Sequence, residues 1–342
     1  MDSDITINVE KYLTPYKYDK PVLTGSGIEG TFDEKAVDIP FVFYHNNKFY
    51  MMYVGFDGIG YQTALATSDN LLDWEHKGVI LARNDKGRWD SGSIAGTWII
   101  KESDNLYDLP KLKKIDGKYW MIYHAYPLAG YEQGRAEIGL AWTEDEELLD
   151  WHRLEEPIFS WKDGGEWEAG GLYKACVIQH DGLYYMFYNA KTDAYSGKPW
   201  IEQTGLATSK DLLHWEKCDK NPILKVTEGA WDSVFLSDPY IVRDGDIWLN
   251  FYYGYDKKHA QDGLAYSRDL VNWIKYPEPI VKSGEPGELD AMHAHKPSIL
   301  YYNDTLYHFY CGVRKWKEGD IARNIGKEFR TICVAASKPF GK

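Results

Sequence analysis

The chain has 342 residues, 44% of them hydrophobic, and a formal net charge of −13 at neutral pH. This acidic balance contains no basic run, so neither nucleic acid nor a membrane surface is expected as a partner, and no apolar stretch is long enough to span a bilayer. The four cysteines show no CxxC or metal-ligand spacing, so we expect free thiols rather than disulfides or a metal site.

The N-terminal segment carries two signals. Its first residues, Met1 to Asp4, do not resemble a signal peptide, so a cytoplasmic protein is predicted, or a periplasmic or secreted one if a leader has been removed. Further along, Pro21-Val22-Leu23 resembles the strand endings that later parts of the chain carry, and we expect it to supply a strand that is missing elsewhere.

Four short apolar runs separated by turn residues form a unit that repeats along the chain. In the third unit these runs and their turn are 174–179, Asp181-Gly182, 183–189, 205–209 and the ending Pro222-Ile223-Leu224. An Asp-Gly turn between alternating apolar runs is typical of a β-hairpin. Each unit is therefore predicted to be a four-stranded antiparallel sheet.

Two short signatures recur and define the number of units. A run ending in small and hydroxyl residues occurs five times, at residues 65–68, 140–143, 206–209, 264–267 and 334–337. An apolar residue followed by an acid precedes each first strand and is interpreted as a structural brace: Phe32-Asp33, Trp89-Asp90, Trp167-Glu168, Trp231-Asp232 and Leu289-Asp290.

These repeats predict one all-β domain over residues 1–342, a five-bladed β-propeller with four-stranded antiparallel blades. The fifth unit stops after its third strand, at Ser337, and Pro21-Val22-Leu23 is expected to provide the fourth. The N-terminal strand would then complete the last blade, close the ring and remove a free sheet edge.

The blades differ most where their first strands begin, and these positions are expected to surround the central axis. They read Asp38-Ile39-Pro40, Tyr173-Lys174-Ala175, Ser237-Asp238-Pro239 and His295-Lys296-Pro297, with either Ala95-Gly96-Thr97 or Asp108-Leu109-Pro110 in the second blade. Charged groups that converge on an axis are costly to bury without a partner or a function. A polar pocket for a hydroxyl-rich ligand is therefore predicted there.

Further residues should reach the same face. Second strands are followed by Asp57, His124, Lys191, Asp193, Asp256 and Arg314. Stacking on sugar rings is expected from the tryptophans outside the repeated positions: Trp98, Trp161, Trp200 and Trp316. The insertion 102–108 and the loop 190–203 are expected to wall the pocket.

In these features the sequence resembles the five-bladed propeller glycoside hydrolases, the superfamily of glycoside hydrolase families 43, 32, 68, 117 and 130. The resemblance rests on the hairpin 181–188, on the repeated Ser-x-Asp-Leu-x-x-Trp, and on Asp238-Pro239. It implies that Asp38 acts as base or nucleophile and that Asp238 orients the sugar or tunes the acid. The general acid stays open between Glu168, the first choice, and the alternatives Glu288, His293 and His295.

The resemblance also implies a substrate class, an oligosaccharide or glycoside. Its binding residues are expected to be Trp98, His124, Lys174, Lys191, His293, His295 and Arg314. No cofactor or metal is expected, except that a central cation near His295 stays open. We therefore predict an exo-acting glycosidase. A phosphorylase resembling family 130, with phosphate on the basic residues, and a non-catalytic sugar-binding propeller are the alternatives.

Overall fold

The computed structural model describes residues 6–341, which form twenty-one strands and three short 3-10 helices. The residues Met1 to Asp4, on which the predicted location depends, lie outside this range. None of the helices in the described range is long and apolar enough to cross a membrane. The chain is therefore all-β, as predicted.

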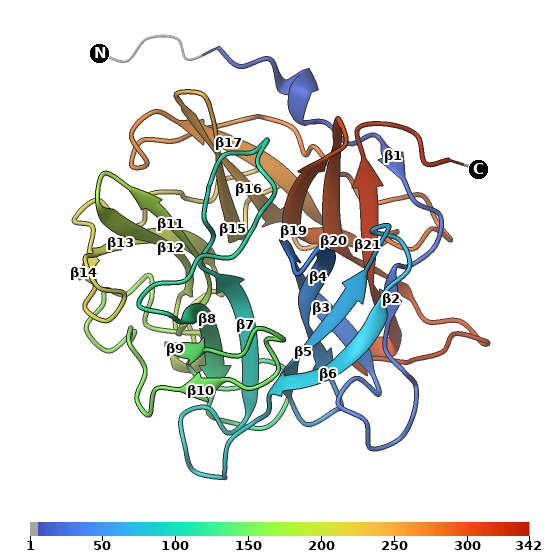
Figure 1. The fold of residues 1–342 in the computed structure, drawn as a ribbon, viewed down its shortest axis with the longest axis horizontal. Helices are drawn as coiled ribbons and strands as arrows, with labels where there is room; N and C mark the ends of the chain where they lie inside the picture. The colour runs from blue at the N-terminus through green and yellow to red at the C-terminus, as the bar shows by residue number, and fades with distance from the viewer. Residues whose placement is uncertain (1–5, 342) are drawn as a thin grey trace.

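Consecutive strands pair into antiparallel sets arranged around a common centre (Figure 1). The first set contains β3 (Ala36–His45), β4 (Lys48–Phe56), β5 (Tyr61–Ser68) and β6 (Glu75–Leu81). The second contains β7 (Ser93–Ile99), β8 (Tyr119–Tyr126), β9 (Glu137–Thr143) and β10 (His152–Arg153). The third contains β11 (Leu172–His180), β12 (Leu183–Lys191), β13 (Glu202–Ser209) and β14 (Glu216–Lys217).

The remaining strands continue this pattern. A fourth set contains β15 (Phe235–Asp244), β16 (Ile247–Tyr255), β17 (Ala260–Ser267) and β18 (Ile274–Lys275). The last set contains β19 (His293–Tyr302), β20 (Thr305–Lys315) and β21 (Glu328–Ala336). The N-terminal elements are η1 (Val9–Tyr12), β1 (Tyr16–Lys17) and β2 (Leu23–Thr24), and two further 3-10 turns are η2 (Ala194–Ser196) and η3 (Ile325–Lys327).

The predicted hairpin turns are confirmed by their backbone angles. Asn46 and Asn47, between β3 and β4, have φ values of 46° and 59°, and Asp181 and Gly182, between β11 and β12, have 48° and 77°. Positive φ at both central residues is the requirement of a type I′ turn, whose twist matches that of the flanking strands. The turns therefore set the register of these hairpins.

The N-terminal segment packs on the last set, as the sequence predicted. Leu23 pairs with Ile332 and Tyr16 with Ala336, both antiparallel to β21. The Val22 amide also donates to the Ile332 carbonyl at 2.9 Å. These contacts cover an edge of β21 that would otherwise present unpaired backbone groups.

A β-bulge interrupts the first strand of every set close to its start. The register shifts fall between Asp38 and Phe41, Gly96 and Trp98, Tyr173 and Ala175, Ser237 and Tyr240, and His295 and Ser298. Four bulge residues adopt positive φ: Ile39, Lys174, Asp238 and Lys296. Such strained positions are typical of functional sites, and bulges re-aim side chains. The head of the second set is therefore Ala95-Gly96-Thr97.

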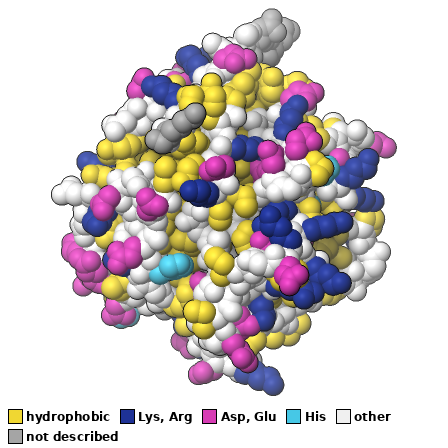
Figure 2. All heavy atoms as spheres, turned by 90° about the vertical axis from the view of Figure 1, so that its right-hand side faces the viewer, with side chains coloured by type: hydrophobic (Ala, Val, Ile, Leu, Met, Phe, Trp, Pro, Cys, Tyr) yellow, Lys and Arg dark blue, Asp and Glu magenta, His cyan; other side chains and the backbone are white. Residues whose placement is uncertain are grey.

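Four of the predicted braces are confirmed as buried ion pairs between neighbouring parts of the chain. The pairs are Lys17–Asp290 at 2.6 Å, Arg153–Asp90 at 3.1 Å, Lys217–Glu168 at 3.1 Å and Lys275–Asp232 at 2.6 Å. All four acids are nearly inaccessible to solvent. On the outer face seen in Figure 2, by contrast, acidic and basic side chains are interspersed.

The insertion 102–108 lies at the far ends of the strands, which corrects the prediction that it walls the pocket. The Leu106 amide donates to the Arg243 carbonyl at 2.8 Å, near the end of β15. The Asp104 carboxylate accepts from the Gln179 amide at 2.9 Å, near the end of β11. The insertion therefore covers the face opposite to the one where first strands begin.

Candidate active site

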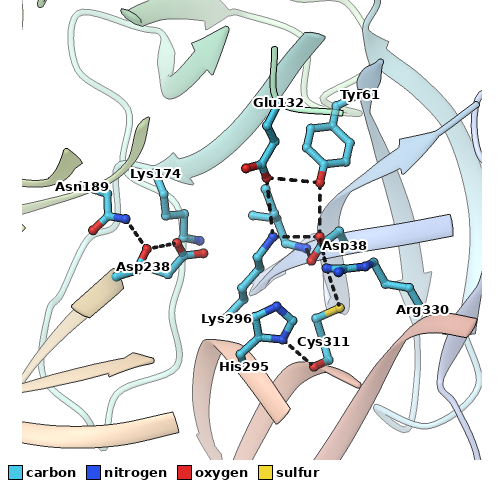
Figure 3. A network of polar contacts seen from close by, with 12 residues as sticks. Asp38, Tyr61, Glu132, Lys174, Asn189, Asp238, His295, Lys296, Cys311 and Arg330 are labelled. Carbon is cyan, nitrogen blue, oxygen red and sulfur yellow. Dashed lines mark hydrogen bonds and ion pairs between the residues drawn. The ribbon is translucent and has the colours of Figure 1, made fainter. Parts of the chain in front are cut away.

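Asp38 is the centre of a buried polar cluster (Figure 3). Its Oδ2 accepts hydrogen bonds from Lys296 Nζ at 2.7 Å, Arg330 Nη1 at 2.9 Å and the Tyr61 hydroxyl at 3.3 Å. Its Oδ1 accepts from the Ile39 amide at 2.8 Å. Burial alone would raise the pKa of Asp38, but the charges of Lys296 and Arg330 outweigh it and hold the pKa far below its usual range. Asp38 is therefore ionised.

Asp238 is the second aspartate of the cluster and differs in its electrostatics. Burial raises its pKa, although Lys174 and Lys296 oppose the shift. Its Oδ1 accepts from the Ser237 hydroxyl at 3.0 Å, and its Oδ2 has no hydrogen-bond partner among the described residues. The structure thus brings the two aspartates predicted from sequence into one cluster with opposite tendencies to ionise.

Glu132 approaches the cluster from the loop between β8 and β9. Its Oε1 lies 3.4 Å from the Tyr61 hydroxyl and 4.0 Å from Lys296 Nζ. Its side chain is 18% exposed, against 1% for Asp38, and its φ is 53°. The neighbouring Tyr131 ring lies 5.6 Å from the Arg330 guanidinium. Glu132 is therefore a carboxylate that solvent, and hence a ligand, can reach.

Glu202 begins β13 and has the properties of a general acid. Its Oε1 accepts from the Trp200 indole at 2.8 Å, and its Oε2 lies 3.5 Å from the Tyr253 hydroxyl. Burial raises the pKa of Glu202 to about 7, an effect that Tyr173 and Lys191 only partly offset. A carboxyl group that titrates near neutral pH can both hold and deliver a proton.

Lys174, Lys191 and His124 surround the same region, as predicted. The His124 Nδ1 accepts from the Lys174 amide at 3.1 Å. Burial and then the charges of Lys174, Lys296 and Lys191 lower the pKa of His124 well below its usual value. His124 is therefore a neutral imidazole set among cations.

Neither histidine at the head of β19 fits the acid role. Burial lowers the pKa of His293 to about 4, and burial with the charge of Lys296 lowers that of His295 further from its usual value. The same cationic neighbours, Lys296 and Arg330, disfavour a metal ion beside His295. No group of three or more His, Cys, Asp or Glu side chains within residues 6–341 is arranged to hold one.

The structure also places the carboxylates considered as acids away from this cluster. Glu168 accepts from the Tyr188 hydroxyl at 3.1 Å and pairs with Lys217, so its carboxylate belongs to a brace. Glu288 is exposed and accepts from the Glu285 amide at 2.8 Å. Neither is available to protonate a ligand that is bound at Asp38.

Two predicted binding residues were wrong. Trp98 follows the bulge of β7 and points into the core, 1% exposed, with its ring 4.9 Å from Phe41 and from Tyr240. It therefore cannot stack on a sugar. Arg314 makes two hydrogen bonds of 2.7 Å to Asp320, which occupy its guanidinium.

Several residues of the cluster were missed in the sequence. Tyr61, Glu202 and Arg330 all lie at or near the start of a third strand, in β5, β13 and β21. Third strands begin at the same end of a set as first strands, because the second strand runs in the opposite direction. Comparing the starts of third strands would have found these three residues.

Comparisons with known proteins agree with this geometry. Residues 175–323 match the glycosyl hydrolases family 32 N-terminal domain. A solved structure described as a complex of BT0996 with RGII is 30% identical, with a TM-score of 0.81, covering 98% of this chain and 94% of that one. Another, described as "Glycoside hydrolase", is 29% identical, with a TM-score of 0.81, covering 99% and 97%.

A curated relative matches part of the chain. A 1,2-beta-oligomannan phosphorylase of Thermoanaerobacter sp. (strain X514) is 28% identical over 178 residues, which is 46% of this chain. The match spans 57% of that relative, just over half of its length.

Proposed function

Because this chain belongs to the β-propeller glycoside hydrolases, we propose that it hydrolyses the bond to a terminal sugar of an oligosaccharide or glycoside. The observation that carries the proposal is the contrast between two buried carboxyl groups. Glu202 has a pKa raised to about 7, whereas the pKa of Asp38 is held low. Glycoside hydrolysis requires one protonated and one ionised carboxyl group beside the scissile bond.

In this proposal Glu202 is the general acid. It donates its proton to the glycosidic oxygen as the bond to the anomeric carbon breaks, and the leaving group departs as an alcohol. Its raised pKa keeps it protonated up to about neutral pH. General acid catalysis of this kind typically contributes about 10²–10⁴-fold in rate.

Glu132 is proposed as the second reacting carboxylate, either attacking the anomeric carbon or taking a proton from the attacking water. This differs from the role that the resemblance implied for Asp38. Asp38 is 1% exposed and already accepts four hydrogen bonds, so it has little capacity to act as a base. Asp38 instead holds Lys296 and Arg330 in position for the reaction.

We also propose the finer architecture, five blades closed into a ring by the N-terminal segment. Support comes from the five first strands with their bulges and from the pairing of β1 and β2 with β21. Such a ring places the five strand heads around one axis, which is where Asp38, Asp238 and Lys296 converge.

A phosphorylase is the alternative function. It is favoured by the similarity to the oligomannan phosphorylase and by the basic side chains at the centre. In that reaction a phosphate oxygen replaces the glycosidic oxygen at the anomeric carbon, and the leaving sugar takes a proton. Both reactions use the same acid, so phosphate dependence separates them.

The test is turnover of a panel of aryl glycosides, furanosides included, with and without phosphate. We expect the wild type to hydrolyse at least one substrate without phosphate, and Glu132→Gln to lose that activity. Glu156→Gln, at an exposed glutamate, is the matched control and should match the wild type. An absolute phosphate requirement would favour the phosphorylase, and full activity in Glu132→Gln would remove Glu132 from the mechanism.

A further inference from the structure

Four lysines are buried within the described part of the chain, and two of them have no anionic partner. Lys296 pairs with Asp38 at 2.7 Å and Lys101 with Asp104 at 3.6 Å. Lys174 and Lys191 are 2% and 4% exposed, but among residues 6–341 no carboxylate lies within 4.0 Å of either ammonium group. An isolated buried charge is costly, so this pair indicates an unfilled requirement for an anion.

The surroundings of Lys191 compensate its charge only in part. Its Nζ lies over three aromatic rings, 4.7 Å from Trp200 and 5.4 Å from both Tyr126 and Tyr173. Cation–π contacts contribute about 0.5–2 kcal/mol, which is less than the cost of removing an ammonium group from water. Trp200 is 42% exposed, so the cage opens towards solvent on that side.

Lys174 lies beside the same cage. It follows Tyr173 directly in the chain, at the bulge of β11, with a φ of 37°. Together with Lys191 and Lys296 it depresses the pKa of the shared neighbour His124, which shows that the three cations lie around one imidazole. Figure 3 shows the Lys174 side chain reaching towards Asp238 and the centre.

The charge balance of the cluster also favours an anion. Four cations meet there: Lys174, Lys191, Lys296 and Arg330. Four carboxyl groups face them, but burial favours the neutral form of two, Asp238 and Glu202. The centre is therefore short of negative charge, although the whole chain carries a net charge of −13.

We propose that Lys174 and Lys191 bind an oxyanion of the reacting ligands. This inference rests on the proposed function and narrows its substrate class. The oxyanion has two sources: the carboxylate of an acidic sugar in the substrate, or inorganic phosphate as the attacking co-substrate. Lysines bind both as compact point charges, and the exposed edge of Trp200 is the route of entry.

The test measures binding of small probes by calorimetry: D-galacturonate and D-glucuronate, the neutral sugars galactose and glucose, and inorganic phosphate. The wild type should bind uronates or phosphate more tightly than neutral sugars. Lys191→Met keeps an unbranched side chain against the rings and should weaken oxyanion binding about 10–100-fold, because a hydrogen bond to a charged group contributes about 1.5–3 kcal/mol.

Two controls separate charge from folding. Lys198→Met, at a side chain 43% exposed near the end of the same loop, should leave oxyanion binding unchanged. Thermal melting of Lys191→Met should show a folded protein that still binds neutral sugars as the wild type does. Lys174→Met provides a second variant with the same expected loss.

Each outcome separates the alternatives. Tighter binding of uronates alone supports an acidic substrate, and tighter binding of phosphate alone supports phosphorolysis. Equal binding of uronates, phosphate and neutral sugars, or oxyanion binding unchanged in both lysine variants, overturns the inference while leaving hydrolysis of neutral glycosides intact. Oxyanion binding without turnover of any glycoside would keep this site and remove the proposed function.

Discussion

The carboxylate of Asp38 and the ammonium group of Lys296 lie 2.7 Å apart, although 258 residues separate them in the chain. Asp38 lies in β3 and Lys296 in β19, so this pair joins the first and last sets of strands. Arg330, from β21, reaches the same oxygen at 2.9 Å. One buried carboxylate thus holds together two cations that come from the last set.

Asp38→Asn should destabilise the fold as well as lower activity. Removing one partner of a buried pair leaves uncompensated charge and typically costs about 3–5 kcal/mol. Urea unfolding at neutral pH measures this free energy, with Asp57→Asn, whose carboxylate pairs with Arg83 nearer the surface, as the comparison. Lost turnover with unchanged unfolding would instead show that Asp38 reacts directly with substrate.

Acid should remove the same contribution. Because the pKa of folded Asp38 lies below its unfolded value of about 3.9, the pair stabilises the protein fully above that value. The stability is lost as the pH falls below about 4. The unfolding free energy of the wild type should therefore decline with acid more steeply than that of Asp38→Asn. Parallel slopes would contradict a low pKa for Asp38.

Glu202 should determine the alkaline limit of activity. The proposed acid must be protonated, and its pKa is raised to about 7, so kcat/KM should fall as the pH rises through about 7. In Glu202→Gln this limb should disappear along with most of the rate. A wild-type profile that stays flat up to pH 9 would show that another group donates the proton.

The two tryptophans Trp98 and Trp200 should respond in opposite ways. Trp98→Ala removes a ring from the core and is expected to cost about 3–5 kcal/mol in unfolding free energy. Trp200→Ala should change stability little, because Trp200 is 42% exposed, but it removes the 2.8 Å hydrogen bond to Glu202 and should shift the pH profile. Thermal melting and pH–rate profiles measure the two effects.

The N-terminal segment should stabilise the last set of strands. Leu23→Ala deletes a side chain that is 4% exposed and pairs with Ile332, and it should cost about 2–5 kcal/mol. Ile28→Ala, at a residue 62% exposed, is the control and should be nearly neutral. Equal effects of the two changes would show that the segment contributes little to stability.

Local signals predicted the strands and turns, because period-two alternation and turn residues such as Asn46-Asn47 act over a few residues. They also brought Asp38, Asp238 and Lys174 to one centre. The same reasoning failed for Trp98, because the bulge of β7 shifts which side chains face the core. It missed Glu202, whose pKa depends on burial by Tyr173 and other distant residues. Burial of that kind is a property of the assembled sheets.

The most direct test of the account compares leaving groups in wild type and Glu202→Gln. Aryl glycosides with a dinitrophenyl group need little help from an acid, whereas the corresponding methyl glycoside or oligosaccharide needs a proton on the leaving oxygen. We predict that Glu202→Gln loses about 10²–10⁴-fold on the poor leaving group and much less on the dinitrophenyl glycoside. Glu288→Gln, at an exposed glutamate, should match the wild type on both. An equal rate in Glu202→Gln and wild type on every cleaved substrate would contradict the central claim.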